Sequence, residues 1–593
     1  MILPPAIIMI AGGALVLALP TRLRGPLTVV VPMLALAQVL WALDPGDAMH
    51  MEWLTLELMP LRVDKLSLMF GLVFAVAALL GGLYAWHKQD RIEQSSALLY
   101  AGSALGIVFA GDLLTLFLFW EIMAGSATLL VWAGSHEKYA GSSRAIAAAT
   151  RYLFVHLVGG ALLLAGILWH LGSGGGLMFE AFSGGPAAWL ILTSFAFNAA
   201  IPPLNAWLTD AYPEASVTGT VFLSAFTTKA AVYVLARGFP GLDILVYAGV
   251  AMAIYGVVYA VLENDVRRLL AYHVISQVGF MVAAVGIGTE IAINAAAAHA
   301  FAHVAYKSLL FMGVGAVIYA TGRRTLTDLG GIAGRMPAVV ALYLVGALSI
   351  SAFPLFSGFV SKSMVMFAAE QEGLTWVVFG LYVASVGTFL HTGLKLPYFV
   401  WFGRRSSASE PEVANVPWGM FAGMGGAALM CVVIGVYPEA LYGQLPFANS
   451  YAPYTTDHVL RSLQILGFTA IGFWLLRDKL RGERTVSMDT DWFYRKAGGP
   501  ARVLIQQPLE ALFTVSGRII NQVVKVATEV AIEPKSTSQK VFELWSRNGS
   551  HRSKRLSDWL ERPPLGFAVA MVVAVAMVVA VWMTLMVVTM VWY

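Results

Sequence analysis

The sequence predicts an all-α polytopic membrane protein with about sixteen transmembrane helices. Its composition is the first observation: 58% of the 593 residues are hydrophobic, 12% are charged, and the mean hydropathy is +0.73. Soluble domains carry about one-quarter charged residues. Apolar runs of roughly 17 to 25 residues, long enough to cross a ~30 Å hydrocarbon core, recur along almost the whole chain. The basic loop residues also alternate between the two predicted sides of the membrane.

The predicted transmembrane helices are defined by these apolar runs. They occupy residues 2–19, 27–43, 66–86, 97–111, 113–133, 147–170, 187–208, 217–237, 242–262, 270–286, 292–320, 338–356, 375–401, 417–436, 459–476 and 566–592. The N-terminal "MILPPAIIMI" has no basic n-region and no small-residue cleavage site. We therefore interpret it as a retained first helix.

The loop charges predict the orientation, because cytoplasmic loops are enriched in Lys and Arg. Alternate loops carry Arg22, Arg24, Lys88, Arg91, Lys138, Arg144, Arg151, Arg267, Arg268, Arg323, Arg324, Arg335, Arg404 and Arg405. The intervening loops carry only Arg62, Lys65, Arg237, Lys362 and Arg461. We expect a multi-pass protein of the cell (inner) membrane with cytoplasmic basic loops and both termini outside.

The last 150 or so residues differ from the apolar block that precedes them. Residues 501–533 are predicted to form an amphipathic helix. Its apolar positions are Ile505, Leu509, Leu512, Ile519, Val523, Val526 and Val530. Two interpretations remain open: a surface helix lying in the headgroup layer, or a strut along the flanks of neighbouring helices.

Several classes of function lack support in the sequence. The single cysteine, Cys431, cannot build a disulfide framework, an iron–sulfur cluster or a thiolate zinc site. Neither G-x-G-x-x-G nor the P-loop motif follows a predicted strand, so nucleotide binding has no signal. The net charge of +4 lies in loops where anionic lipid explains it. We predict no cofactor, no metal and no nucleic-acid partner.

One acid and three lysines lie away from the ends of predicted transmembrane helices: Glu121, Lys229, Lys307 and Lys395. A charged group near the bilayer centre costs roughly 2.5 to 3.5 kcal/mol on insertion scales, so such residues are candidates for function. We interpret Lys362 differently, as a side chain that reaches the interface from a helix end. Pro397, two residues after Lys395, is expected to break its helix.

Histidines accompany two of these lysines at helical spacing. His299 and His303 stand eight and four residues before Lys307, and His391 stands four residues before Lys395, so each set shares one helix side. A neutral imidazole both donates and accepts hydrogen bonds and suits a proton path. The alternative for each histidine is a hydrogen bond between helices. The spacing of His299 and His303 also fits metal ligands, but no carboxylate or thiol is near in sequence and a cation follows.

Glu121 is expected to pair with Lys229. A lone carboxylate in hydrocarbon takes up a proton unless a cation stands close. A pair that opens and closes would release and recapture a proton, so it could act as a gate.

Six ordered motifs carry a resemblance to a known family. They are "LFLFWEIM", "WLTDAYPEASVTGTVFLSAFTTKAAVYVLAR", "NDVRRLLAYHVISQVGF", "HAFAHVAYKSLLF", "FPLFSGFVSKSMV" and "LHTGLKLPYFVWF". Over residues 60 to 440 the chain resembles the antiporter-like subunits shared by Mrp-type cation/proton antiporters, respiratory complex I and membrane-bound hydrogenases. The resemblance implies a fourteen-helix core with two inverted five-helix repeats, a broken helix in each, and a row of charged residues at the membrane midplane.

The resemblance also implies roles and boundaries. Glu121 is similar to the glutamate of the first half, Lys229 to its broken-helix lysine, Lys307 to the central lysine and Lys395 to the terminal residue of the second half. The implied regions are N-terminal helices 1–96, a first repeat region 97–262, a second repeat region 263–410, core helices 411–480, a cytoplasmic-side linker with the amphipathic helix 481–565, and a final helix 566–593.

The chain departs from the family pattern at three points. Arg267 stands where many relatives have a lysine, and arginine hardly deprotonates. Asn205 stands where relatives have a histidine. The tail after residue 440, with its amphipathic and final helices, resembles the L-type subunit of complex I, whereas the lysine in "TGLKLPYF" resembles the D-type subunit of Mrp antiporters.

These observations predict a proton-translocating subunit of a multisubunit Mrp-type Na+/H+ antiporter, with Glu121, Lys229, Lys307 and Lys395 as the relay and His299, His303 and His391 as supporting groups. The predicted partners are other membrane subunits, the bilayer, H+ and Na+. The alternative is a proton-pumping subunit of a complex I-type or hydrogenase-type redox complex. A scaffold that conducts nothing is a third interpretation, and the set of buried charges weighs against it. Whether the parent complex is an enzyme stays open.

Overall fold

The computed structural model describes residues 3–53, 56–137, 142–403, 412–480, 489–490 and 492. The chain divides into one unit of residues 1–490 and a second of residues 491–593. The predicted amphipathic helix and the predicted last transmembrane helix lie outside the described residues. The description below concerns the first unit.

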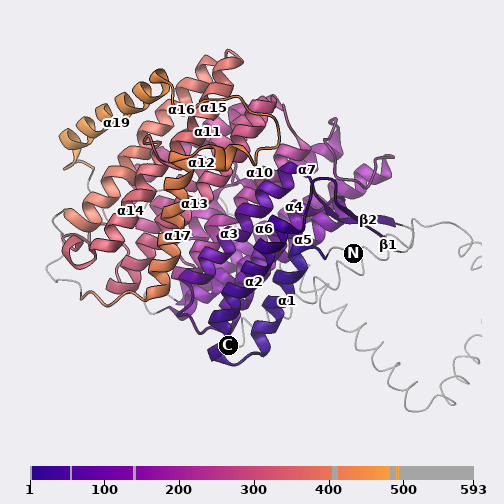
Figure 1. Cartoon of the computed structure of the whole chain (residues 1–593), viewed down its shortest axis with the longest axis horizontal. Helices are drawn as coiled ribbons and strands as arrows, with labels where there is room; N and C mark the ends of the chain where they lie inside the picture. The colour runs from indigo at the N-terminus through magenta and orange to yellow at the C-terminus, as the bar shows by residue number, and fades with distance from the viewer. Residues whose placement is uncertain are drawn as a thin grey trace, which may run out of the picture. The chain divides into compact units, whose positions relative to one another are not determined.

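The first unit is helical apart from one small hairpin (Figure 1). Strands β1 (Ala48–Trp53) and β2 (Leu56–Arg62) pair antiparallel between the second and third helices. The fold class predicted from the sequence, an all-α polytopic membrane protein, is confirmed. The hairpin is an addition that the hydropathy pattern did not predict, because its strands are short and carry polar residues among the apolar ones.

The helices follow each other with short connections. In the first half they are α1 Pro5–Ala18, α2 Thr21–Trp41, α3 Lys65–Tyr84, α4 Arg91–Phe109, α5 Leu113–Trp132, α6 Ser142–Gly172, α7 Pro186–Ala199, α8 Ala206–Ala211, α9 Val217–Ala225 and α10 Thr227–Gly238. In the second half they are α11 Asp243–Leu262, α12 Val266–Ile287, α13 Glu290–Thr321, α14 Pro337–Ile350, α15 Ser357–Gln371, α16 Thr375–Thr388, α17 Trp418–Val436, α18 Glu439–Tyr442 and α19 Thr456–Leu476.

Eleven helical spans within the described residues are long and apolar enough to cross a membrane, and α1, α7 and α14 are shorter apolar helices. Four of the helices begin at an aspartate. Asp64, Asp90, Asp112 and Asp265 accept hydrogen bonds from backbone N–H groups in the first turns of α3, α4, α5 and α12. Polar loop residues therefore fix where these apolar helices start.

The centre of the bundle is formed by α13 and the helices around it (Figure 1). Helix α13 packs against α3, α9, α12, α14, α15 and α17. All of the apolar window of α13 and of the α9–α10 span is buried, against 17% for α19. The central helices are thus the ones shielded from lipid, and they carry the buried Lys229, His299, His303 and Lys307.

Two non-helical stretches separate consecutive helices in the bundle. Residues 200–205 separate α7 from α8, and residues 351–356 separate α14 from α15. Each contains a non-glycine residue with positive φ, Ala200 at 58° in the first, and Ala352 at 59° and Leu355 at 74° in the second. Non-helical backbone in a membrane is tolerated where protein or a water-filled cavity covers it. The broken helix that the resemblance implies for Lys229 corresponds instead to a separate, short interruption at Phe226, between α9 and α10.

Two further details differ from the sequence expectation. Helix α15 was not among the predicted helices, because its serines and Lys362 lower its hydropathy. The expected break at Pro397 does not occur. Helix α16 continues as a π-helix over Phe389–Lys395 and, after Pro397, over Tyr398–Phe402. A π-helix accommodates the missing proline N–H by shifting hydrogen bonds from i→i+4 to i→i+5.

Candidate functional site

Lys229 lies three residues after a short interruption in its helix, at Phe226 between α9 and α10. The ammonium is completely buried and donates to the Ser224 carbonyl at 2.5 Å and to the Thr228 hydroxyl at 3.1 Å. Ser224 belongs to the last turn of α9, whose carbonyls carry partial negative charge. The helix end therefore stabilises the buried cation in place of a carboxylate.

Lys307 lies in the middle of α13, together with the predicted histidines. His299, His303 and Lys307 are all fully buried. His299 bonds the Ser361 hydroxyl at 3.0 Å, whereas both ring nitrogens of His303 and the Lys307 ammonium have no hydrogen-bond partner among the described residues. The Lys307 ammonium lies 5.6 Å from the Phe311 ring centroid. Lys307 is thus held less tightly than Lys229.

The structure shows that the sequence interpretation of Lys362 was wrong. The side chain does not reach the membrane interface: the residue is 1% exposed and lies in α15, just after the break that follows α14. Its ammonium donates to the Ile350 carbonyl, the last of α14, at 2.8 Å, and lies 5.0 Å from the Phe280 ring centroid. Lys362 therefore belongs with the buried lysines. Residues 351–356, the break before α15, are mostly apolar in sequence and were therefore included in the predicted helix 338–356. The sequence analysis missed this break.

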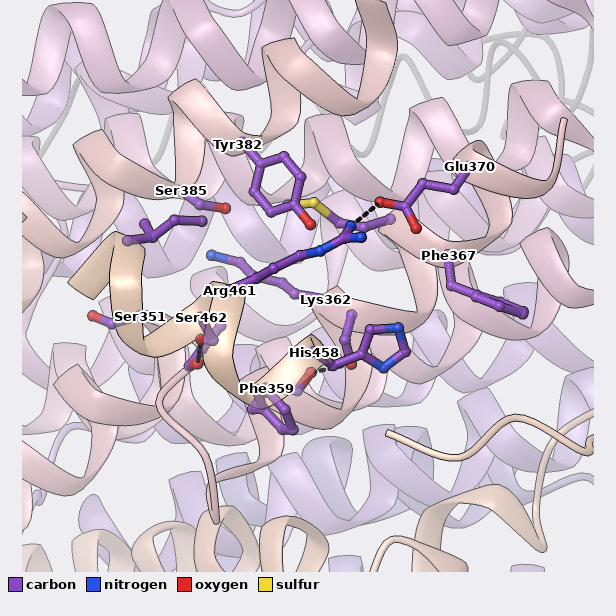
Figure 2. A pocket seen from close by; sticks show the side chains of 14 residues that line it. Ser351, Phe359, Lys362, Phe367, Glu370, Tyr382, Ser385, His458, Arg461 and Ser462 are labelled. Atoms are coloured by element: carbon purple, nitrogen blue, oxygen red, sulfur yellow. Dashed lines mark hydrogen bonds and ion pairs between the residues drawn. The ribbon is translucent and has the colours of Figure 1, made fainter. Parts of the chain in front are cut away.

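A pocket of about 50 Å³ leads to Lys362 from the surface between α15, α16 and α19. Figure 2 shows the Lys362 side chain at the pocket beside Tyr382 and Ser385, with Arg461 and Glu370 joined by an ion pair of 2.8 Å. A cavity needs a volume of roughly 10–15 Å³ to hold one water molecule. The pocket is large enough for a few waters next to the ammonium.

Lys395 occupies the end of the π-helical segment that continues α16. Its ammonium donates to the carbonyls of Val261 at 2.6 Å and Glu263 at 3.4 Å, at the C-terminus of α11. His391 lies one turn earlier, and its ring nitrogen is 3.3 Å from a ring nitrogen of His273 on α12. His273, a fully buried residue that the sequence analysis did not single out, connects the two sets of residues.

Electrostatic interactions join these groups into one row. The charges of Lys229 and Lys362 act on Lys307, and His273 is influenced by Lys307, Lys362 and Lys395. Three of the four lysines, Lys229, Lys362 and Lys395, bind a carbonyl at the C-terminal end of a helix. Lys307 has no such partner within the described part of the chain.

Glu121 stands apart from this row. It lies on α5 against Gly160 of α6, and one carboxylate oxygen has no partner among the described residues. No ion pair between Glu121 and Lys229 forms in this structure, since Lys229 binds the end of α9 instead. Other buried polar atoms of the same region are also without a described partner: Nε2 of His156, the Ser194 hydroxyl and the side-chain amide of Asn198.

Arg267, one of the departures from the family pattern, has a structural position. It is 2% exposed, and its guanidinium donates to the Ala215 carbonyl at 2.6 Å and to the Thr220 hydroxyl at 3.3 Å. It ties α12 to the start of α9. This contact suits a permanently charged group and needs no proton release.

Outside the membrane-spanning segments, Glu214 forms the clearest charge cluster. Burial alone would raise its pKa, but Arg324, at 2.8 Å, and Arg144 hold the pKa of Glu214 below its usual value. Arg324 also pairs with Asp265 at 2.7 Å. These ion pairs fasten the loop before α9 to the loop after α13.

Comparison with known proteins assigns the chain to a family. The family model "NADH:quinone oxidoreductase/Mrp antiporter, TM" matches residues 110–389. An uncharacterized protein of Methanocaldococcus jannaschii is 30% identical over 395 residues, covering 63% of this chain and 80% of that protein. The M-type subunit of the NADH-quinone oxidoreductase of Pseudomonas aeruginosa is 26% identical, covering 68% and 81%. A Na(+)/H(+) antiporter subunit of Alkalihalophilus pseudofirmus is 26% identical, covering 64% and 52%.

Solved structures share the fold. A chain of the Mrp complex from Dietzia sp. matches with a TM-score of 0.67 and 24% identity, covering 78% of this chain and 98% of that one. A chain of the archaeal membrane-bound sulfane sulfur reductase matches with a TM-score of 0.68 and 24% identity, covering 97% and 99%. The chain belongs to the family described as NADH:quinone oxidoreductase/Mrp antiporter, TM.

Proposed function

We propose that this chain is the proton-translocating subunit of a multisubunit Mrp-type Na+/H+ antiporter. The observation that carries the proposal is the set of buried lysines and histidines whose charges act on one another. It includes Lys229, His303, Lys307 and Lys362, and, through His273 and His391, Lys395. Buried cations without carboxylate partners are costly, so a purely structural role does not account for them.

Lys307 would be the central exchange point. The other three lysines are each held by a carbonyl at a helix C-terminus, which favours the charged ammonium. Lys307 lacks that support, so its proton can pass more easily to His303 or to a neighbouring lysine. The histidines are suited to this transfer because a neutral imidazole both accepts and donates.

Transfer along the row would be driven by charge repulsion. A unit charge brought to about 5 Å from another changes its energy by roughly 3 kcal/mol at an effective dielectric near 20. That is about a hundredfold in a protonation equilibrium. Protonation at Lys229 would thus favour release from Lys307, and the water-sized pocket beside Lys362 would connect the row with one membrane surface.

Glu121, which stands apart from the row in this structure, would act as a carboxylate that binds and releases a proton. The predicted pairing with Lys229 would then be a transient state, formed when Lys229 leaves the Ser224 carbonyl. Na+ would cross this subunit or a partner. The other membrane subunits of the complex are the expected partners, and the cell membrane is the expected location.

One observation favours a second candidate, a proton-pumping subunit of a redox complex. The chain of the sulfane sulfur reductase matches 97% of this chain, whereas the Mrp chain matches 78%. The lysine in "TGLKLPYF" supports the antiporter. In the redox alternative, partner subunits would carry out the electron transfer.

Inverted membrane vesicles that contain the complex test both proposals. A Na+ pulse, without any electron donor, should dissipate an imposed pH gradient read by a fluorescent dye, and Lys307→Ala should abolish the response. A response that requires an electron donor would support the redox complex instead. A Na+ response that survives in Lys229→Ala, Lys307→Ala and Lys362→Ala alike would contradict the proposed row.

A further inference from the structure

A carboxylate from the chain after α19 is buried in the helix bundle. Asp489 is 4% exposed, although it belongs to a charged, turn-rich stretch of sequence. One carboxylate oxygen accepts a hydrogen bond from the Tyr255 hydroxyl and the other from the Tyr272 hydroxyl. The Thr209 hydroxyl donates to the second oxygen at 3.5 Å. Each oxygen is thus satisfied by a hydroxyl.

The adjacent residue makes a second polar contact. The Thr490 hydroxyl donates to the side-chain carbonyl oxygen of Asn205 at 3.3 Å. Asn205 is completely buried and is the last residue of the break between α7 and α8. The two residues 489–490 therefore bind where the backbone of the first broken helix is irregular.

The hydroxyls that receive Asp489 come from three helices. Thr209 lies on α8, Tyr255 on α11 and Tyr272 on α12, and we call these residues with Asn205 the hydroxyl cradle. Ring contacts order the cradle: the Tyr259 ring lies 4.5 Å from the Tyr255 ring and 5.5 Å from the Tyr272 ring, between centroids.

The cradle has the chemistry of a carboxylate site. Among the described residues, no cation lies within ion-pair distance of Asp489. Hydroxyl donors can stabilise a buried carboxylate, because hydrogen bonds to charged groups are stronger than neutral ones. Without a carboxylate, the same hydroxyls would lose these acceptors.

We propose that the hydroxyl cradle is the docking site of residues 489–490, and that Asp489 is the residue that anchors this two-residue segment to the helix bundle. Docking joins the α7–α8 break to α11 and α12, which belong to the end of the first predicted repeat region and the start of the second. Asp489 is therefore a positioning residue for the broken helix. The inference does not depend on which ion the protein moves.

Cross-linking in membranes that hold the whole complex tests the docking. In a Cys431→Ser background, the substitutions Asn205→Cys and Thr490→Cys should allow a short bifunctional methanethiosulfonate reagent to link the two sites. Adding Asp489→Ala should lower the linking rate about tenfold, because a hydrogen-bonded charged group is lost. The double substitution Tyr255→Phe and Tyr272→Phe should also lower the linking rate.

A matched control separates docking from general charge effects. Asp478, whose side chain is 97% exposed, lies in the same basic stretch after α19, and Asp478→Ala should leave the linking rate unchanged. Native gels report whether each variant still assembles. Equal linking rates with and without Asp489 in assembled complexes would overturn the proposal, as would two reactive cysteines that never link.

Discussion

The two long helix breaks of this chain are alike in backbone but differ in side chains. In the first, Ala200 follows the end of α7 with φ of 58°; in the second, Ala352 follows the end of α14 with φ of 59°. Lys362 reaches across the second break to the last carbonyl of α14. The corresponding turn of α7 carries Asn198, a neutral amide whose polar atoms have no described partner.

The comparison shows that the same backbone conformation can be combined with a charged side chain at one break and a neutral one at the other. Residues with positive φ outside glycine cost free energy, and they persist where the surroundings enforce them. At the second break that backbone exposes a carbonyl that stabilises an ammonium. At the first break Thr490 donates a hydrogen bond to Asn205 instead. A cation is thus bound at the second break, whereas a neutral polar contact is made at the first.

The largest effect should separate the two breaks directly. Lys362→Gln removes the cation at the second break, and we expect proton transport in vesicles to fall about 100-fold, as is typical for loss of a proton-transfer group. Asn198→Ala, at the first break, should lower transport less than about threefold because it removes no titratable group. Equal losses in the two assembled variants would show that the breaks do not differ in function.

Lys307→Arg should have a nearly comparable effect while keeping the charge. Arginine remains protonated, so it can occupy the centre of the row but cannot release a proton. We expect transport to fall about 100-fold with normal assembly. The control is Arg267→Lys, at a position that binds backbone and hydroxyl oxygens and should keep most of the activity. Normal transport in Lys307→Arg would rule out proton release at Lys307.

A smaller effect concerns the packing of Glu121. A Cβ at Gly160 would overlap the Glu121 carboxylate, whereas a Cβ at Gly159 would meet Phe197 at an ordinary 3.6 Å. Gly160→Ala should cost about 1 to 3 kcal/mol of stability, and Gly159→Ala should be neutral or slightly stabilising because alanine favours the helix. Thermal unfolding of the purified complex in detergent measures both. Similar melting temperatures for the two variants would mean that Glu121 moves aside freely.

The smallest effect lies in the loops that connect the two halves. Because the folded-state pKa of Glu214 lies below its ordinary value, its ion pair with Arg324 stabilises the fold at neutral pH, and this contribution is lost as pH falls through that lowered pKa. Glu214→Gln should cost about 1 kcal/mol at pH 7. The difference from wild type should shrink as the pH drops below 4.5, the ordinary pKa of a glutamate. A difference that grows with acidification would contradict the assigned pair.

The sequence alone predicted most of the fold, and the reason is hydropathy. Runs such as that of α13 are apolar over their full length, so their existence follows from the cost of exposing backbone to lipid. Helix α15 escaped prediction because its serines and Lys362 interrupt the apolar pattern. Its burial depends on neighbouring helices, which hydropathy does not report.

The site could be predicted in part for a similar reason. Glu121, Lys229, Lys307 and Lys395 stood out as ionisable residues in apolar runs. Their partners could not be predicted, because three of the four buried lysines bind carbonyls of helix ends rather than side chains. His273 gave no spacing signal, as its neighbour in space, His391, is 118 residues away in sequence.

The π-helical stretch that ends α16 gives this part of the chain a register that can change. A π-turn contains one residue more than an α-turn. Converting it to α-helix would rotate the residues beyond it by about 100° and shift them by about 1.5 Å along the axis. His391 and Lys395 lie within this stretch. A change of helical register could therefore move both side chains together, like one step of a screw, while the helix stays unbroken.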